Sequence, residues 1–501
     1  MRLSSKHANP QMIEYKDFTG GLNTTNAIEM IEMNELNHCI NFELMGNLLR
    51  TVSGTKDIYR TETLHFSDIF YDTINNLLIV GTSDRKIFTI QPNGGDLKEL
   101  GSLTGTITPD FAVWEDGVLI ASGGKLQYFN GNELLTLEKS PDVCNGVFTS
   151  HGRVIVYYDD VIKYSAVGDE TDWAEDTNVD SSSKWLQVGY KDGGKITNVV
   201  NLSADILAFK SNNTAFHIAG QYPDWQQREI SRNISSRGLR TALSLTSSAI
   251  VLGDSSLQAI TVTDDYGEMK ATDLAAKVED DIKAIGKIVK ARYIAPLNQI
   301  WLLTGDKTFL FLDVEHVAFF KREYNTPAVD ACYHGDKVYV LKSDAICYLD
   351  NGDNMRDNGE VMHWEMYAKT LVSYNDFLVK RVRVDITPMF QNYADVRFWV
   401  GHVQLSELVP KEALQIWHDY TQLYHSKRSL KSVPIADIYS NGDEIYDNDD
   451  EIYRNPTYIK STTYVRQTKR QVDRHKGIKV HGKGHGGRFI LNLINFEMVE
   501  V

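Results

Sequence analysis

Short apolar runs separated by polar turns recur along the middle of the chain. Each repeat has a run rich in β-branched and aromatic residues, a turn rich in Gly, Asp, Ser and Asn, and a second such run. This pattern predicts a β-hairpin. Seven hairpins are visible: LLIVGTSDRKIFTI (77–90), VLIASGGKLQYFN (118–130), VIVYYDDVIKYSA (154–166), ILAFKSNNTAFHI (206–218), AIVLGDSSLQAITV (249–262), IWLLTGDKTFLFLD (300–313) and VYVLKSDAICYLD (338–350).

The hairpins recur at a spacing that identifies the fold class. Most of them follow another apolar run, such as DIFYD at 68 or DFAVW at 110, and a fourth strand is expected to lead into the next repeat. Their first residues lie 36 to 52 positions apart. Four-stranded repeats of this length predict an all-β protein with a six- or seven-bladed β-propeller. Two packed β-sandwiches are the alternative, and the spacing leaves it open.

The pattern changes near residue 366, where longer strands with alternating polarity begin. DFLVKRVRVDITPMF (376–390) and ADVRFWVGHVQL (394–405) predict such strands. KEALQIWHDYTQLY (411–424) predicts a short helix after Pro410, and two further strands close the chain. We therefore expect an N-terminal extended arm or ring-closing strand (1–60), a β-propeller (61–365) and an additional C-terminal β-rich assembly domain (366–501).

Composition narrows the possible partners. The 501 residues include 67 acidic and 52 basic side chains, a net charge of −15, so the general surface is expected to repel nucleic acid phosphates. Four scattered cysteines without a CxxC pair argue against a disulfide scaffold or a zinc module. The N-terminus lacks the apolar stretch of a signal peptide, and no run approaches the roughly 20 apolar residues of a membrane span.

The residues do not predict an enzyme or a cofactor. A hydrolytic propeller needs acids or arginines that converge from several blades, and the acids show no recurrence at equivalent blade positions. In HGKGHGG (481–487), His481 and His485 have a helical metal-ligand spacing, but the glycines disfavour a helix. The phosphate-loop spacing is also incomplete there. A hairpin turn or β-bulge before the last strand is the preferred interpretation.

An Ile-Tyr pair recurs every seven residues in IYSNGDEIYDNDDEIY (438–453), here called the acidic ladder. Asp-rich turns argue against a helical heptad, and the match to a calcium loop lacks its glycine and its last glutamate. We predict extended steps at a subunit or tail-protein interface, with the acids facing a basic segment or solvent. The candidate residues are Ile438, Tyr439, Ile445, Tyr446, Asp447, Asp449, Asp450, Ile452 and Tyr453.

The basic segment that follows (466–488) has eight Lys and Arg residues against one acid. A solvated strand pair is one interpretation. The others are contact with passing DNA and docking on an acidic neighbour such as the acidic ladder. The candidate interface residues are Arg466, Lys469, Arg470, Arg474 and Lys476, and the remaining bases are Lys479, Lys483 and Arg488.

Several stretches resemble one family of viral proteins. DFTGGLNT contains Phe18, Gly20, Gly21, Leu22, Asn23 and Thr24, and a looser element contains Gly46, Leu48, Arg50 and Gly54. YSAVGDETDW (164–173), SRNISSRGLRTALSLTSSAIVLGDSSL (231–257) and KGHGGRFILNLINFEMVEV (483–501) follow. Together they resemble the tail hub or nozzle proteins (tail tube or stabilisation proteins) of short-tailed, podovirus-like bacteriophages.

The resemblance implies a structural protein of the virion tail, assembled in the host cytoplasm. It implies a homohexameric ring that contacts an adaptor or portal-proximal ring and tail fibres. Double-stranded DNA would pass through the lumen during ejection without specific binding, and no receptor-binding or lytic segment is recognised. The alternatives are a carbohydrate-binding or carbohydrate-cleaving propeller at a host surface, and a cellular propeller scaffold.

Overall fold

The computed structural model describes residues 11–202, 205–262, 269–286, 289–350, 356–388, 394–400, 403–404, 462–467, 472–476, 478–484 and 488–500. They form two compact units. The propeller unit comprises Asp57–Phe309 and Thr326–Tyr348, and the composite unit comprises Met1–Lys56, Leu310–Asn325 and Leu349–Val501. Three strands belong partly to each unit: β6 (Thr55–Arg60), β29 (Thr308–Asp313) and β33 (Ala345–Leu349).

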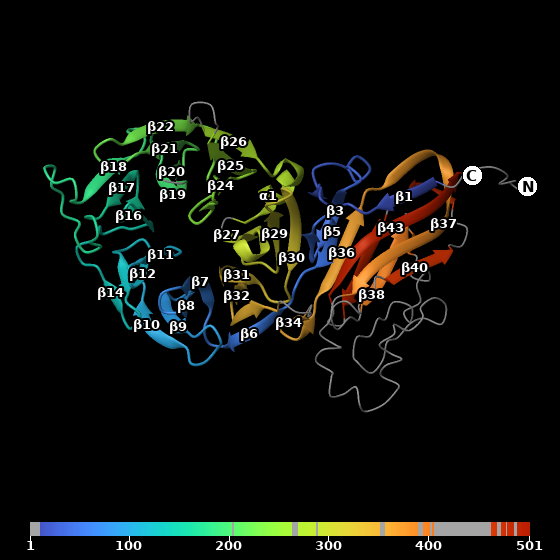
Figure 1. Cartoon of the computed structure of the whole chain (residues 1–501), viewed down its shortest axis with the longest axis horizontal. Coiled ribbons are helices and arrows are strands. Elements are labelled where there is room, and N and C mark those ends of the chain that lie inside the picture. The colour runs from blue at the N-terminus through green and yellow to red at the C-terminus, as the bar shows by residue number, and fades with distance from the viewer. Residues whose placement is uncertain are drawn as a thin grey trace, which may run out of the picture. The chain divides into compact units, whose positions relative to one another are not determined.

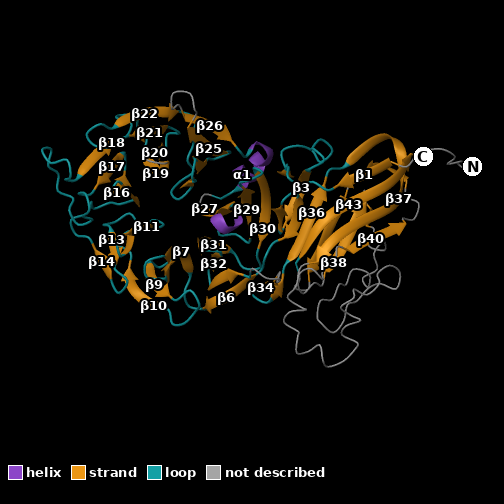
Figure 2. Ribbon diagram, viewed as in Figure 1, coloured by secondary structure: helices purple, strands orange, loops and turns teal. Residues whose placement is uncertain are grey.

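The propeller unit contains five complete four-stranded antiparallel sheets, which follow one another in chain order (Figures 1 and 2). Their strands are β7 (Phe66–Asp72), β8 (Leu77–Thr82), β9 (Lys86–Ile90) and β10 (Lys98–Ser102); β11 (Asp110–Trp114), β12 (Gly117–Ala121), β13 (Gln127–Phe129) and β14 (Leu134–Thr136); β15 (Gly146–Ser150), β16 (Arg153–Tyr158), β17 (Val161–Tyr164) and β18 (Lys184–Gln187); β19 (Ile196–Leu202), β20 (Asp205–Lys210), β21 (Ala215–Ala219) and β22 (Gln226–Ser231); β23 (Ala242–Ser244), β24 (Ser248–Leu252), β25 (Leu257–Val262) and β26 (Met269–Asp273).

Two further ladders complete the ring of this unit. One pairs β27 (Lys290–Ile294) with β28 (Gln299–Leu303), and the other joins β31 (Ala328–His334), β32 (Lys337–Lys342) and β33. The first strands β7, β11, β15, β19, β23, β27 and β31 are successive neighbours around a closed ring (Figure 1). The described part of this unit is therefore a propeller of seven blades, the higher of the two predicted counts.

The core of the propeller lies between neighbouring blades. For example, Ile79 and Ile87 of the first blade pack against Val118, Ile120 and Phe129 of the second. Because each sheet is covered on both faces, the second strands are buried at nearly every position. This explains why the sequence shows continuous apolar runs there, without the alternation of a half-exposed strand.

Helix is scarce in the described residues. A single turn-and-a-half α-helix, α1 (Glu279–Ala284), follows the 3-10 turn Ala276–Val278, and a second 3-10 turn covers Ala295–Leu297. Three acids in the first turn of α1 favour it through the helix dipole, and Ile282 anchors it in the core. No described helix has the length and apolar character needed to cross a lipid bilayer.

Two β-sheets contain most strands of the composite unit, and β34 and β35 pair with each other outside them. The first has the order β4-β5-β43-β37-β40, with β1 paired to β43 and β41 paired to β37; in the second, β30, β3, β36, β42, β38 and β39 are successive neighbours and β2 pairs with β3. Phe42, Trp364 and Phe489 pack edge to face, with ring centroids 5.1–6.0 Å apart, and join the two sheets. The strands are β1 (Gln11–Tyr15), β2 (Gly21–Leu22), β3 (Glu35–Ile40), β4 (Phe42–Met45), β5 (Leu48–Thr51), β30 (Ala318–Glu323), β34 (Arg356–Asp357), β35 (Glu360–Val361), β36 (His363–Ala368), β37 (Leu371–Pro388), β38 (Ala394–Val400), β39 (Val403–Gln404), β40 (Thr462–Gln467), β41 (Val472–Lys476), β42 (Ile478–Gly484) and β43 (Phe489–Glu500).

The N-terminal segment differs from the expected separate arm. Residues of β1 and β5 pair directly with β43, for example Tyr15 with Ile494 and Arg50 with Ile490. The N-terminal and C-terminal strands therefore belong to one compact unit, and the three expected segments do not form three separate domains. Backbone pairing between segments that are more than 400 residues apart decides this arrangement.

The long C-terminal strands agree with the sequence analysis. Residues 376–388 lie in β37, and the last strand is β43. The preferred turn at HGKGHGG is wrong for its first four residues, because His481–Gly484 extend β42 and pair with β36 and β38. His485 and the predicted helix at 411–424 lie outside the described residues.

Candidate functional site

The predicted assembly residues fall mostly where the structure gives no description. The whole acidic ladder, from Ile438 to Tyr453, lies outside the described residues, as do Lys469 and Arg470. Arg466 lies on β40, and Arg474 and Lys476 lie on β41. Both strands pair with β37, so the fold brings these three positions to one sheet. The predicted interface itself stays a prediction.

Arg488 does not belong to a solvated basic surface. Its side chain is 4% exposed; Nη2 donates to Glu43 Oε1 at 3.0 Å and Nε donates to the Thr51 carbonyl at 2.9 Å. The expectation of a solvent-facing or docking arginine is wrong at this position. The residue directly precedes the last strand, β43, and its charge is paired with Glu43 inside the composite unit.

Glu43 collects three arginines in the core of the composite unit. Besides Arg488, Arg50 donates to Glu43 Oε1 from Nη2 at 2.9 Å, and Arg322 donates to Oε2 at 2.9 Å. Glu43 and the Arg322 side chain are essentially inaccessible. Removing one partner of such a buried charge network typically costs about 3–5 kcal/mol. The Glu43 cluster therefore holds together β4, β5, β30 and the start of β43.

Several residues of the stretches that carry the sequence resemblance are internal. Gly21 has φ of 61°, and a Cβ there would lie 2.8 Å from that of Ala318. Asn23 donates to Glu35 at 2.8 Å inside the composite unit. In the propeller unit, Trp173 is buried and donates from Nε1 to the Glu170 carbonyl at 2.8 Å, which closes the turn that follows β17.

A polar layer recurs at equivalent positions of the propeller blades. In each blade, one residue of the inner segment is opposite the fifth residue of the second strand. The seven positions, here called the inner polar positions, carry polar side chains in six blades, namely Asp68, Asp110, Asn198, Thr241, Lys290 and Asp330, and Gly146 in the remaining one. The expectation that acids do not recur at equivalent positions is therefore wrong, because three of the seven are aspartates.

Three inner polar positions accept hydrogen bonds from backbone N–H groups of the next blade of the ring. Asp330 Oδ2 accepts from the backbone N–H of Ile69 at 3.2 Å, and Asp110 Oδ2 accepts from that of Val147 at 3.1 Å. Asn198 Oδ1 accepts from the N–H of Thr241 at 3.3 Å. Each bond satisfies a backbone donor at a seam between two sheets. The polar layer thus connects blades that otherwise contact one another through apolar side chains.

Opposite charges from three blades meet where the ring closes. Lys290 Nζ lies 2.6 Å from Asp68 Oδ1 and 3.4 Å from Asp330 Oδ2, and Arg292 contacts both Asp330 oxygens at 2.8 and 3.2 Å. Burial alone would raise the pKa of Asp330, but the charges of Arg292 and Lys290 hold it below its ordinary value. Burial opposes the charge of Arg292, yet Asp330 raises its pKa overall.

Arg240 forms a second buried connection between blades. It donates to the Tyr157 hydroxyl at 3.1 Å, to the carbonyls of Thr108, Pro109 and Asn145 at 2.7–3.1 Å, and lies 3.4 Å from Asp110. Burial raises the pKa of Tyr157 to about 12, against the opposing effect of Arg240. A single side chain therefore bonds to groups from two other blades.

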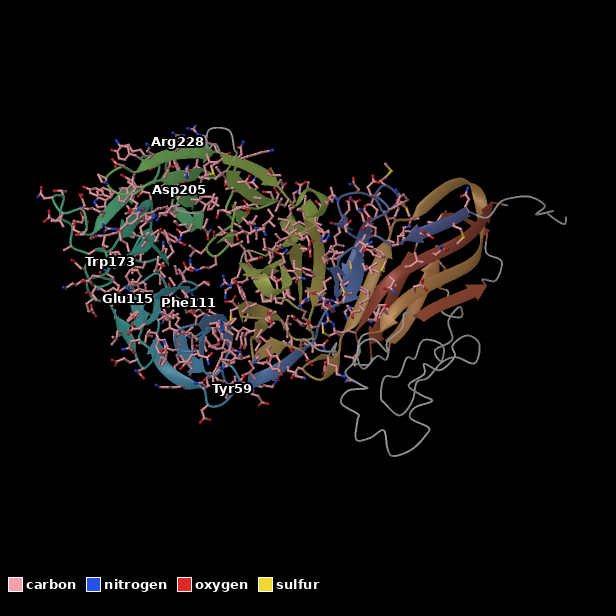
Figure 3. All side chains as sticks on the ribbon, viewed as in Figure 1. Tyr59, Phe111, Glu115, Trp173, Asp205 and Arg228 are labelled. Atoms are coloured by element: carbon pink, nitrogen blue, oxygen red, sulfur yellow. The ribbon has the colours of Figure 1, made fainter. Side chains whose placement is uncertain are left out.

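A cavity of about 440 Å³ lies beside this polar layer, between the inner strands β7, β11, β27 and β31. Phe70 and Phe111 stack at 5.1 Å on its wall, and Figure 3 places Phe111 on the inner side of the ring. Tyr71 and His334 stack at 4.2 Å nearby. Burial and Asp330 raise the pKa of Cys332, so that this thiol is a weak nucleophile. Among the described residues, no three His, Cys, Asp or Glu side chains are grouped to hold a metal ion.

Comparison of the chain with known proteins finds solved structures that resemble it in fold. No protein-family model and no curated protein matches the chain. One similar solved structure is BamB from Moraxella catarrhalis, with 12% sequence identity and a TM-score of 0.40; the match covers 62% of this chain and 93% of that one. Another is the β-propeller domain of Myceliophteria thermophila Cps50 (Swd1), with 10% sequence identity and a TM-score of 0.43; the match covers 59% of this chain and 98% of that one. The computationally designed Ika8 protein is also similar, with 10% sequence identity and a TM-score of 0.39; the match covers 67% of this chain and 99% of that one. The strand pairing described above shows an all-β protein whose four-stranded sheets form a β-propeller.

Proposed function

We propose that the chain is a structural subunit of a short bacteriophage tail, a nozzle or hub component. In this proposal, copies of the chain form a homohexameric ring through which double-stranded DNA is ejected. The observation that carries the proposal is that stretches resembling nozzle proteins supply internal supports of both units. Phe18, Asn23 and Trp173 are buried, and Arg50 and Arg488 bind Glu43.

The charge distribution supports a conduit that does not bind its cargo. The net charge of −15 disfavours adhesion of phosphates to the general surface. The bases at the ring closure, buried Lys290 and half-buried Arg292, are neutralised by aspartates of the same chain. These bases are therefore already paired within the subunit. Neighbouring subunits would use the basic strands and the acidic ladder for orientation and register.

Mass photometry of the purified full chain, alone and mixed with virion tails, tests the proposal. A six-subunit species, and labelling of the tail below the capsid in electron micrographs, are the expected results. A monomer that hydrolyses a glycan contradicts the nozzle function.

The acidic ladder allows a sharper assembly test. Replacing Asp447, Asp449 and Asp450 together by Asn should weaken ring or tail assembly, and high salt should weaken the wild-type assembly in the same way, because screening reduces attraction between exposed charges. The exposed Asp306→Asn is the matched control. Unchanged assembly combined with loss of a calcium dependence would favour an ion site instead.

A carbohydrate-binding propeller at a host surface is the second candidate. The observation that favours it is an aromatic cavity between two blades, lined by Arg153, which has no acidic partner among the described residues. Aromatic walls with a few polar groups are typical of small-ligand sites. Binding of sugars to a stable monomer would support this function over the nozzle.

A further inference from the structure

A second cavity, of about 240 Å³, lies between the blade of β15–β18 and the blade of β19–β22. Three connections form it: the turn between β15 and β16, the long segment between β17 and β18, and the segment between β21 and β22. The middle one contains the GDETDW stretch of the sequence resemblance. At about 30 Å³ for each water molecule, the cavity has room for one small ring and not for an extended chain.

The cavity wall contains a guanidinium group without an acidic partner. Arg153 donates from Nη1 to the carbonyls of Ser165 and Ser182 at 2.5 and 2.7 Å, and from Nη2 to the carbonyl of Asp180 at 2.6 Å. Burial lowers the pKa of Arg153, and Tyr164 opposes this effect. An arginine has five N–H donors, so two remain without a partner among the described residues. Arg153 is half-buried, and a cation in such a place that has only neutral partners favours an anionic ligand.

Lys184, a second base close to the cavity, also donates only to neutral oxygen atoms. Lys184 is buried, and its Nζ donates to the carbonyls of Asp176 and Val179 and to the Ser182 hydroxyl at 2.6–3.0 Å. It also lies 4.3 Å from the ring centroid of Tyr222, which lines the cavity. By contrast, buried Lys210 of the same unit contacts a carboxylate at 2.5 Å. Neither Arg153 nor Lys184 therefore has a carboxylate at ion-pair distance among the described residues.

The remaining walls are aromatic and have one exposed acid. Trp225 stacks on Tyr164 at 4.8 Å and meets Tyr222 edge to face at 5.5 Å. The buried hydroxyl of Tyr164 has no hydrogen-bond partner among the described residues. Asp180 lines the cavity at its surface. Aromatic faces pack on the C–H faces of sugars, and a carboxylate accepts hydrogen bonds from hydroxyls while it repels a free dianion.

We propose that this cavity binds an acidic monosaccharide unit, a sugar ring that carries a carboxylate. The carboxylate pairs with Arg153, one face of the ring packs on Trp225 or Tyr222, and a hydroxyl donates to Asp180. The contacts require no covalent step and no cofactor. The inference stands independently of the nozzle proposal, because it concerns one subunit and holds for a monomer or a ring.

Calorimetric titration of the full chain with glucuronic acid at pH 7 tests the site. Glucose lacks the carboxylate, cyclohexanecarboxylate lacks the hydroxyls, and inorganic phosphate lacks the ring. Each of the three should bind at least tenfold more weakly than glucuronic acid. No glucuronic acid binding, or phosphate binding of equal strength, overturns the proposal.

Variants then locate the site on the chain. Trp225→Ala and Asp180→Asn should each weaken glucuronic acid binding about tenfold or more, whereas Arg153→Lys should weaken it and retain a preference for the anion. Arg228→Gln is the matched control, since Arg228 is an exposed residue of β22 outside the cavity lining (Figure 3). Thermal denaturation verifies that each variant folds. If folded Asp180→Asn and Trp225→Ala both bind as the wild type does, the site lies elsewhere and the proposal fails.

Discussion

Replacing Asp330 by Asn removes one charge at the point where the propeller ring closes. The wild-type carboxylate is fully buried and contacts Arg292 through both oxygens, Lys290 at 3.4 Å and the backbone N–H of Ile69. Asparagine keeps the shape and one acceptor oxygen. It can therefore preserve the bond to Ile69, but it leaves Arg292 without a carboxylate and Lys290 with Asp68 alone.

The expected loss follows from the cost of leaving half-buried Arg292 without its carboxylate next to buried Lys290. Breaking a buried ion pair by removing one partner costs about 3–5 kcal/mol. Because asparagine retains part of the hydrogen bonding, the lower end, about 3 kcal/mol, is expected. For a domain of this size class, each kcal/mol shifts the melting temperature by about 2–4 °C, so the midpoint should fall by about 6–12 °C.

The assay is thermal and urea denaturation of the full chain between pH 3 and pH 7, with Asp306→Asn as control. Asp306 is an exposed turn residue of the same unit, and its replacement should change stability by less than about 0.5 kcal/mol.

The folded-state pKa of Asp330 is below its ordinary value. Its stabilisation is therefore complete above the unfolded pKa of about 4 and is lost as the pH falls through the folded pKa. The difference between wild type and variant should be constant from pH 5 to 7 and shrink in acid. A loss below about 1 kcal/mol, or a difference that does not depend on pH, would refute the reasoning.

Three further predictions concern packing and burial. Gly54→Ala should destabilise the protein by about 1–3 kcal/mol in urea denaturation, because a Cβ would lie 2.2 Å from a backbone carbonyl oxygen, whereas Gly238→Ala has open space and should be close to neutral. Arg240→Met should cost about 3 kcal/mol or more, since it leaves a tyrosine hydroxyl and three carbonyls without their donor; a loss under about 1 kcal/mol would contradict the role of Arg240 as a connection between blades. Burial raises the pKa of Cys39, and that of Cys144 to about 12, so a thiol reagent at pH 8 should modify both only after unfolding, and fast labelling of the folded chain would show that these sites open.

The hairpin signal in the sequence was sufficient to predict the propeller. Apolar runs of five or six residues with Gly, Asp or Asn between them specify two paired strands wherever they occur, and the seven predicted hairpins agree with the structure in position. The apolar pattern does not predict the first strand β27, because Lys290 and Arg292 interrupt it. These same bases form the charge cluster at the ring closure. The two bases that interrupt the apolar pattern of β27 thus mark the charge cluster, but the sequence alone does not show which acids they contact.

The inner polar positions could not be recognised along the chain. Asp, Gly, Asn, Thr and Lys occupy them, and register shifts precede three of the polar members, Asp68, Asn198 and Asp330. Their equivalence becomes visible only when each is aligned with its partner on the second strand. The same applies to the cavity between the third and fourth blades, whose lining comes from residues between 150 and 225. Local patterning carries no information about which loops meet across a seam.

The sequence by itself determined the element type, the hairpin boundaries and the all-β class, because these depend on local side-chain alternation and turn chemistry. Only the tertiary structure decided that the N-terminal strands join the C-terminal ones, and that Arg488 is a buried partner of Glu43 and not part of a basic surface. It also decided which charges neutralise one another and which, such as Arg153, do not. The physical reason is that pairing between distant segments depends on burial and complementary geometry, which arise only when the whole chain is folded.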